Sequence, residues 1–218
     1  WALESPADRA EYTVVPSRGN FSPHLQIRDT DVFVSPPGVV GRFDGTENGP
    51  WRLKDDGKTH YTWPSKGGWF ESPDYDTFLD SPFVSTDKAK VKEMLFNGKP
   101  HRVVLFGKNE SQTPDGYLTA GALVAEHAQK LFGELPYPSY TFYLDFGGPG
   151  GGLEHLNSTR IGLGARSTPE NSVGIMFHEY FHCFNVKRIR PEGLGPFDYS
   201  KPAPGATLWW LEGVTDYY

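Results

Sequence analysis

His178-Glu179-Tyr180-Phe181-His182 has the spacing of a metal-binding helix. Upstream, Thr168-Pro169-Glu170 predicts a helix start, because it combines a hydroxyl cap, a proline and an acid. Residues four apart lie on one face of a helix, so the imidazoles of His178 and His182 can point at one metal ion. Glu179 lies about 100° further around the helix, where it can reach a water beside the metal but not the metal itself.

A third protein ligand is needed, because a catalytic zinc site has three and leaves one position for water. Leu208–Asp216 reads as a second helix, in which Glu212 and Asp216 are four residues apart and share a face. The spacing predicts Glu212 as the third ligand of one Zn²⁺ and Asp216 as the acceptor that orients a ligand histidine. A five-residue motif of this kind also arises by chance, and its histidines would then be ordinary surface or core residues.

The composition is typical of a globular protein, with 22% charged and 37% hydrophobic residues among 218. The formal net charge is −6, and the densest basic run is Lys187–Arg190. Nucleic acid is therefore not expected as a partner, because it needs an extended positive surface. No stretch approaches the roughly 18 uninterrupted apolar residues of a membrane helix, so we expect no membrane span. The oligomeric state is not indicated.

The first half of the chain is rich in turn residues. Short apolar segments separated by Gly, Pro, Asn and Asp predict a β-rich N-terminal domain over residues 1–107. Within it, Val91–Phe96 and His101–Phe106 flank Asn97–Pro100, and the Asn-Gly pair predicts a hairpin because both residues tolerate positive φ.

The second half, residues 108–218, mixes helical and strand patterns. Apolar spacing predicts a helix from Leu118 to Phe132, and the metal-binding helix should run to Ile189 before Pro191 ends it. A last helix is expected from about residue 206. Residues 140–146 predict a strand, and the glycines of residues 147–152 predict a loop. The fold class is therefore α/β (α+β), a β-rich domain followed by a sheet-and-helix part.

Longer stretches resemble a known family. His178–Pro191 and Leu208–Tyr218 resemble the M61 glycyl aminopeptidase family, and Gly151–Thr159, Asp80–Pro82 and Phe132–Tyr137 are similar to it as well. Members of that family are gluzincins, zinc peptidases whose third ligand is a glutamate on a second helix. The resemblance implies the N-terminal part of a thermolysin-like catalytic domain. It also implies that the C-terminal helical and PDZ-like parts are missing here, and that the location is extracytoplasmic, periplasmic or secreted.

The resemblance also implies substrate-binding roles. The segment Gly151-Gly152-Leu153-Glu154 is similar to the strand of related aminopeptidases that holds the substrate, and the glutamate there binds the free amine. Carried over, Glu154 binds the amine, while Gly151 and Gly152 let the backbone approach the peptide. Without the resemblance, the glycine run also fits a flexible loop and Glu154 an exposed surface acid.

Together these observations predict a zinc-dependent aminopeptidase that removes small N-terminal residues such as glycine, with Glu179 as general base. Its partner would be a peptide with a free N-terminus. Two alternatives stay open: a zinc endopeptidase of the same fold, and a peptide-binding module that has lost catalysis.

Overall fold

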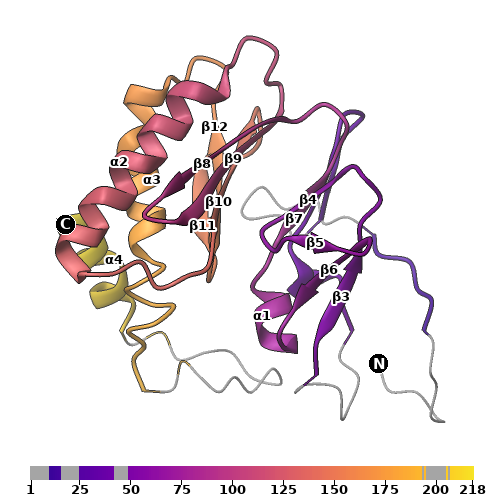
Figure 1. The fold of residues 1–218 in the computed structure, drawn as a ribbon, viewed down its shortest axis with the longest axis horizontal. Helices are drawn as coiled ribbons and strands as arrows, with labels where there is room; N and C mark the ends of the chain where they lie inside the picture. The colour runs from indigo at the N-terminus through magenta and orange to yellow at the C-terminus, as the bar shows by residue number, and fades with distance from the viewer. Residues whose placement is uncertain (1–9, 16–24, 42–48, 193, 195–204, 206) are drawn as a thin grey trace.

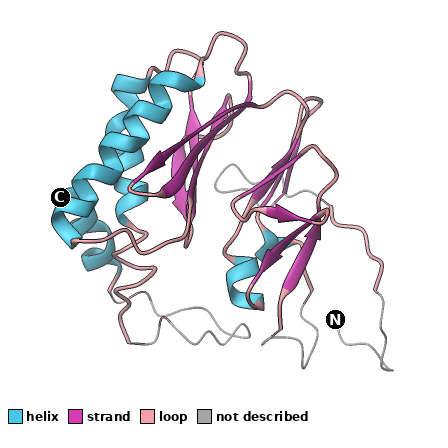
Figure 2. Ribbon diagram, viewed as in Figure 1, coloured by secondary structure: helices cyan, strands magenta, loops and turns pink. Residues whose placement is uncertain are grey.

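The computed structural model describes residues 10–15, 25–41, 49–192, 194, 205 and 207–218 (Figure 1). The two long helices and the C-terminal helix lie on one side of a central sheet, and the smaller sheets, with a short helix beside them, lie on the other (Figure 2). This confirms the α/β class with a β-rich N-terminal part. Among the described helices, none is both long and apolar enough to cross a membrane.

The central sheet has five strands in the order β11-β12-β10-β9-β8. β10 runs parallel to β9 and β12, whereas β8 and β11 are antiparallel to their neighbours. The strands are β8 (Lys90–Phe96), β9 (Lys99–Gly107), β10 (Tyr140–Phe146), β11 (Gly151–Glu154) and β12 (Ser158–Leu163). The Gly-Gly-Leu-Glu segment thus forms β11, at an edge of the sheet.

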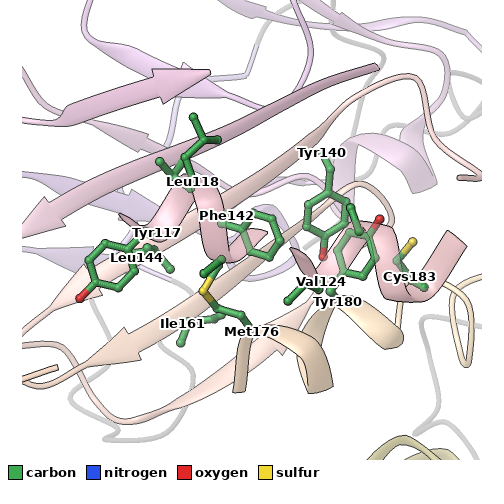
Figure 3. Packing of buried hydrophobic residues seen from close by; sticks show 14 of the residues in the cluster. Tyr117, Leu118, Val124, Tyr140, Phe142, Leu144, Ile161, Met176, Tyr180 and Cys183 are labelled. Carbon is green, nitrogen blue, oxygen red and sulfur yellow. The ribbon is translucent and has the colours of Figure 1, made fainter. Parts of the chain in front are cut away.

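Two long helices, α2 (Pro114–Phe132) and α3 (Pro169–Phe181), cover one face of this sheet (Figure 2). Figure 3 shows Tyr180 of α3 beside Tyr140 of β10 in the core between the two layers. The Tyr180 ring centroid lies 4.6 Å from that of Tyr140 and 5.9 Å from that of Phe142. Since residues two apart on a helix differ by about 200°, a buried Tyr180 directs His178 and His182 away from this core.

A short C-terminal helix, α4 (Leu208–Tyr217), packs at the end of α3. The Tyr218 ring, just beyond α4, stacks on Phe181 with the centroids 6.0 Å apart. Leu211 is buried on the inner side of α4. These contacts bring the carboxylates of α4 to the histidines of α3.

The chain before β8 forms a four-stranded sheet, order β1-β2-β7-β4, and a three-stranded sheet, order β3-β6-β5. Phe33 and Val84 of the four-stranded sheet pack on Val104, Phe106 and Tyr143, on the face of the central sheet opposite α2 and α3. β10 is consequently buried along its whole length. The elements are β1 (Leu25–Ile27), β2 (Val32–Val34), the 3₁₀ turn η1 (Pro36–Gly38), β3 (Trp51–Lys54), β4 (Thr59–Tyr61), β5 (Ser65–Lys66), β6 (Trp69–Ser72), α1 (Tyr75–Leu79) and β7 (Phe83–Ser85).

The predicted hairpin is confirmed, with a shorter turn. β8 and β9 are joined by two residues, Asn97 (φ 49°) and Gly98 (φ 73°). This pair reverses the chain by itself, so Lys99 and Pro100, predicted as part of the loop, already belong to β9.

Other predicted boundaries were wrong. The helix predicted from Leu118 begins at Pro114, because a proline is favourable in the first helical turn. The helix predicted to reach Ile189 ends at Phe181, and tight turns follow it. Asn185, in these turns, bonds to the C-terminal helix instead of continuing α3. The glycine-rich segment is a loop only at its start, because Gly151 and Gly152 pair with β12. The last helix begins at Leu208, and residue 206 lies outside the described residues.

The division of the chain at 107/108 stays a prediction. The central sheet takes β8 and β9 from before that point and β10 to β12 from after it. The ladder between β9 and β10, which includes the pair Leu105 and Leu144, joins the two parts in one sheet.

Candidate metal centre

Local sequence fixes the start of α3. The Thr168 side chain accepts a hydrogen bond from the Asn171 backbone, and the Asn171 side chain accepts one from the Thr168 backbone. This reciprocal cap satisfies two N–H groups that a helix start would otherwise leave unpaired. At the C-terminal end of α3, the Nε2 atoms of His178 and of the C-cap residue His182 come within 3.2 Å of each other.

α4 contributes the carboxylates. Glu212 Oε2 lies 3.3 Å from His178 Nε2 and 3.5 Å from His182 Nε2. The four-residue spacing places Asp216 on the same face of α4, and its Oδ1 lies 2.7 Å from His178 Nδ1. The structure thus brings together the three predicted ligands, His178, His182 and Glu212, and places the predicted acceptor Asp216 beside His178.

The protonation pattern of the two imidazoles leaves their lone pairs facing each other. His178 Nδ1 donates to Asp216, and His182 Nδ1 donates to the backbone carbonyl of Asn185 at 3.1 Å. Because each Nδ1 carries the proton of a neutral ring, each Nε2 is an acceptor without hydrogen. Two bare nitrogens and the Glu212 oxygen repel one another at these distances unless a metal cation or a further proton lies between them.

The triangle of these three atoms fits a metal ion. Its edges measure 3.2, 3.3 and 3.5 Å. Ligand atoms about 2.0–2.1 Å from zinc at tetrahedral angles lie about 3.3 Å apart, so the three atoms match one face of such a tetrahedron. Two imidazoles and one carboxylate are also a donor set typical of catalytic zinc.

Asn185 supports this cluster, although the sequence analysis did not identify it. Its carbonyl orients His182, and its buried side-chain amide donates to Leu211 O at 3.1 Å and Thr215 Oγ1 at 3.3 Å. These two bonds to α4 hold Asn185 in the turns that follow the end of α3 at Phe181.

Asn185→Ala keeps the carbonyl that orients His182 but loses the amide that bonds to α4, the helix that carries Glu212. Metal binding is expected to weaken about tenfold, the lower end of the range for groups that only support the ligands. Titration with zinc in a competing chelator measures this. Asn109→Ala is the matched control: Asn109 is equally buried, and its amide donates to Leu105 O at 2.7 Å, remote in sequence from the cluster. Equal metal affinities in the two variants would contradict the proposed role.

Glu179 lies beside the cluster but contributes no ligand atom to it. Its side chain is buried, and within the described residues its Oε2 has no hydrogen-bond partner. Burial, followed by the charges of Glu154 and Glu212, raises the pKa of Glu179 to about 8. A nearby dication would favour the ionised form.

The Glu179 side chain packs against β11. A Cβ added to Gly152 would lie 2.2 Å from Glu179 Cδ, so only glycine lets this carboxylate lie against the strand. Gly151 has a φ of 95°, which also favours glycine. Glu154, two residues further along β11, lines a cavity of about 290 Å³ together with Asp80 and Lys187. The edge strand thus runs from the cluster towards this cavity.

Comparison with known proteins gives matches to peptidases. Residues 171–218 match the model of the M61 glycyl aminopeptidase family. An aminopeptidase N family protein from Idiomarina loihiensis is 26% identical, with a TM-score of 0.77 over 89% of this chain and 37% of that chain. Aminopeptidase A of Legionella pneumophila, solved with aspartic acid, is 9% identical, with a TM-score of 0.50 over 74% of this chain and 23% of that one.

This chain therefore spans about a third of the length of the Idiomarina protein. No curated protein matches it. The family match covers α4 and most of α3, the two helices that carry the cluster, and the structural likeness extends over most of the chain. The chain is thus similar to the M61 glycyl aminopeptidase family over residues 171–218 and, in its fold, to an aminopeptidase N family protein.

Proposed function

We propose that this chain forms the catalytic part of a zinc-dependent aminopeptidase. The observation that carries the proposal is the triangle of His178 Nε2, His182 Nε2 and Glu212 Oε2, with the buried carboxylate of Glu179 beside it. These three atoms would hold one Zn²⁺. Bound zinc would supply positive charge that polarises the scissile carbonyl and makes the attacking water more acidic.

The residues of the chain would handle the proton and the substrate. Glu179 takes a proton from the attacking water as the oxygen of that water bonds to the scissile carbonyl carbon. As the C–N bond breaks, Glu179 delivers that proton to the leaving amine. Asp216 and the Asn185 carbonyl keep the ligand imidazoles in the tautomer that presents Nε2.

Substrate selection would depend on β11. An edge strand offers backbone hydrogen-bonding groups to an extended peptide, and Gly151 and Gly152 allow a close approach. Glu154 would bind the free N-terminal ammonium and so place the first peptide bond over the cluster. The family's description as glycyl aminopeptidases supports a preference for small N-terminal residues.

A substrate pair tests this proposal in the full-length protein. Glycyl and N-acetylglycyl anilides are compared before and after zinc removal by a chelator. Cleavage of the free amine alone, lost on chelation and restored by zinc, is expected, and Glu154→Ala should raise KM for it. Equal cleavage of both substrates would indicate an endopeptidase, and zinc binding without any cleavage would indicate a binding module.

A further inference from the structure

Asp80 lies in the Asp80–Pro82 segment, just after α1 and far in sequence from the metal cluster. Its carboxylate nevertheless contacts two segments of the catalytic part. Oδ1 lies 2.9 Å from Lys187 Nζ and 3.1 Å from His155 Nδ1, and Oδ2 accepts a hydrogen bond from the Leu156 backbone at 3.0 Å. Asp80 thus connects the turn after β11 with the segment after α3.

These contacts require an ionised Asp80. Burial opposes ionisation, but the charge of Lys187 and the hydrogen bond from His155 outweigh it and lower the pKa of Asp80 to about 2. His155 is 4% exposed, and within the described residues its Nε2 has no hydrogen-bond partner. The bond to Asp80 is therefore a main polar anchor of that ring.

The segment Asn185–Lys187 is held by contacts at both of its ends. Val186, just before it, has a φ of 147°, which a β-branched residue rarely adopts. Such strain persists where the surroundings impose it. Asn185 on one side is bonded to α4, and Lys187 on the other is bonded to Asp80.

Glu154 shares its cavity with the Asp80–Lys187 pair. Glu154 directly precedes His155, which Asp80 holds. An ammonium group in the same cavity would pair with Glu154 and repel a substrate ammonium, unless another carboxylate held it. Asp80 supplies that carboxylate.

We propose that Asp80 is a positioning residue for substrate binding. It holds the Lys187 ammonium and the turn after β11 so that Glu154 stays available to the N-terminal ammonium of the peptide. This inference rests on the proposed function. It assigns a substrate-binding role to a residue outside the motifs of α3, α4 and β11.

The test compares Asp80→Asn with the double variant Asp80→Asn plus Lys187→Met in the full-length protein. Asparagine keeps the shape of the side chain but loses the negative charge. The released Lys187 ammonium should then pair with the Glu154 carboxylate. KM for the glycyl anilide should rise about tenfold or more with little change in kcat, since hydrogen bonds to charged groups have effects of this size. Removing Lys187 in the same chain should return KM most of the way to that of the parent.

Rescue separates this role from a merely structural one. If Asp80 only stabilised the fold, deleting a second partner would not restore KM. An unchanged KM in Asp80→Asn, or a double variant no better than the single one, would overturn the inference. If Asp80→Asn does not fold, Asp80→Ser, which also removes the negative charge, replaces it with the same expectations.

Failure of this inference differs from failure of the proposed function. If the unaltered protein does not cleave the glycyl anilide, the proposed function fails. If it cleaves that substrate in a Glu154-dependent way, but the Asp80 variants do not show the raised KM and its rescue, only the proposed role of Asp80 fails. Zinc content, measured in every variant, should stay at that of the parent.

Discussion

Replacing Glu179 with glutamine is expected to lower kcat/KM about a hundredfold to ten-thousandfold, the usual contribution of a positioned general base. Glutamine keeps the size of the side chain but cannot accept the proton of the attacking water. Metal content should not change, because Glu179 contributes no atom to the ligand triangle. The fold should not suffer either, because the substitution removes a buried carboxylate whose Oε2 has no hydrogen-bond partner in the described part of the chain.

Steady-state kinetics with the glycyl anilide, together with zinc analysis of the same samples, measures this effect. Glu170→Gln is the matched control, since Glu170 lies on the same helix but is exposed in its first turn. The control should retain the parent rate. A Glu179→Gln variant that holds zinc and hydrolyses the substrate at the parent rate would exclude Glu179 as the base.

Replacing Glu212 with glutamine is expected to weaken zinc binding by more than about 100-fold and to remove activity in parallel. The loss should exceed the range for residues that only orient ligands. The neutral amide oxygen cannot supply the negative charge that the Glu212 carboxylate offers between the two imidazoles. Chelator-competition titration gives the affinity, and excess zinc should restore part of the activity.

A graded series makes the second prediction specific. Asp216→Asn removes the charged acceptor of His178 but no ligand atom, so its affinity should fall between those of Glu212→Gln and the parent. The expected order places Glu212→Gln lowest. The reverse order, with Asp216→Asn the weaker binder, would mean that Asp216 rather than Glu212 is the third ligand.

Local sequence rules predicted the parts of the fold that depend on neighbouring residues. The Asn97-Gly98 turn follows from two residues that tolerate positive φ, and the start of α3 follows from the Thr168 cap before Pro169. The four-residue spacings on α3 and α4 placed His178 and His182 on one face, and Glu212 and Asp216 on another, from helix geometry alone.

Contacts between distant segments were not predictable in the same way. Asp80 reaches Lys187 across 107 residues, and no periodic pattern encodes such a pairing. The early end of α3 likewise depends on Asn185 bonding to α4, a helix that lies further along the chain. The spacing of apolar residues reports only on the segment that contains them. It therefore predicted that α3 continues until the next proline.

We propose one metal ion between the C-terminal end of α3 and the facing side of α4. Diffraction from zinc-soaked crystals, recorded on both sides of the zinc absorption edge, tests it most directly. We expect one strong anomalous peak about 2.0–2.1 Å from the Nε2 atoms of His178 and His182 and from a carboxylate oxygen of Glu212. A zinc peak elsewhere on the chain, with none between these three side chains, would contradict it.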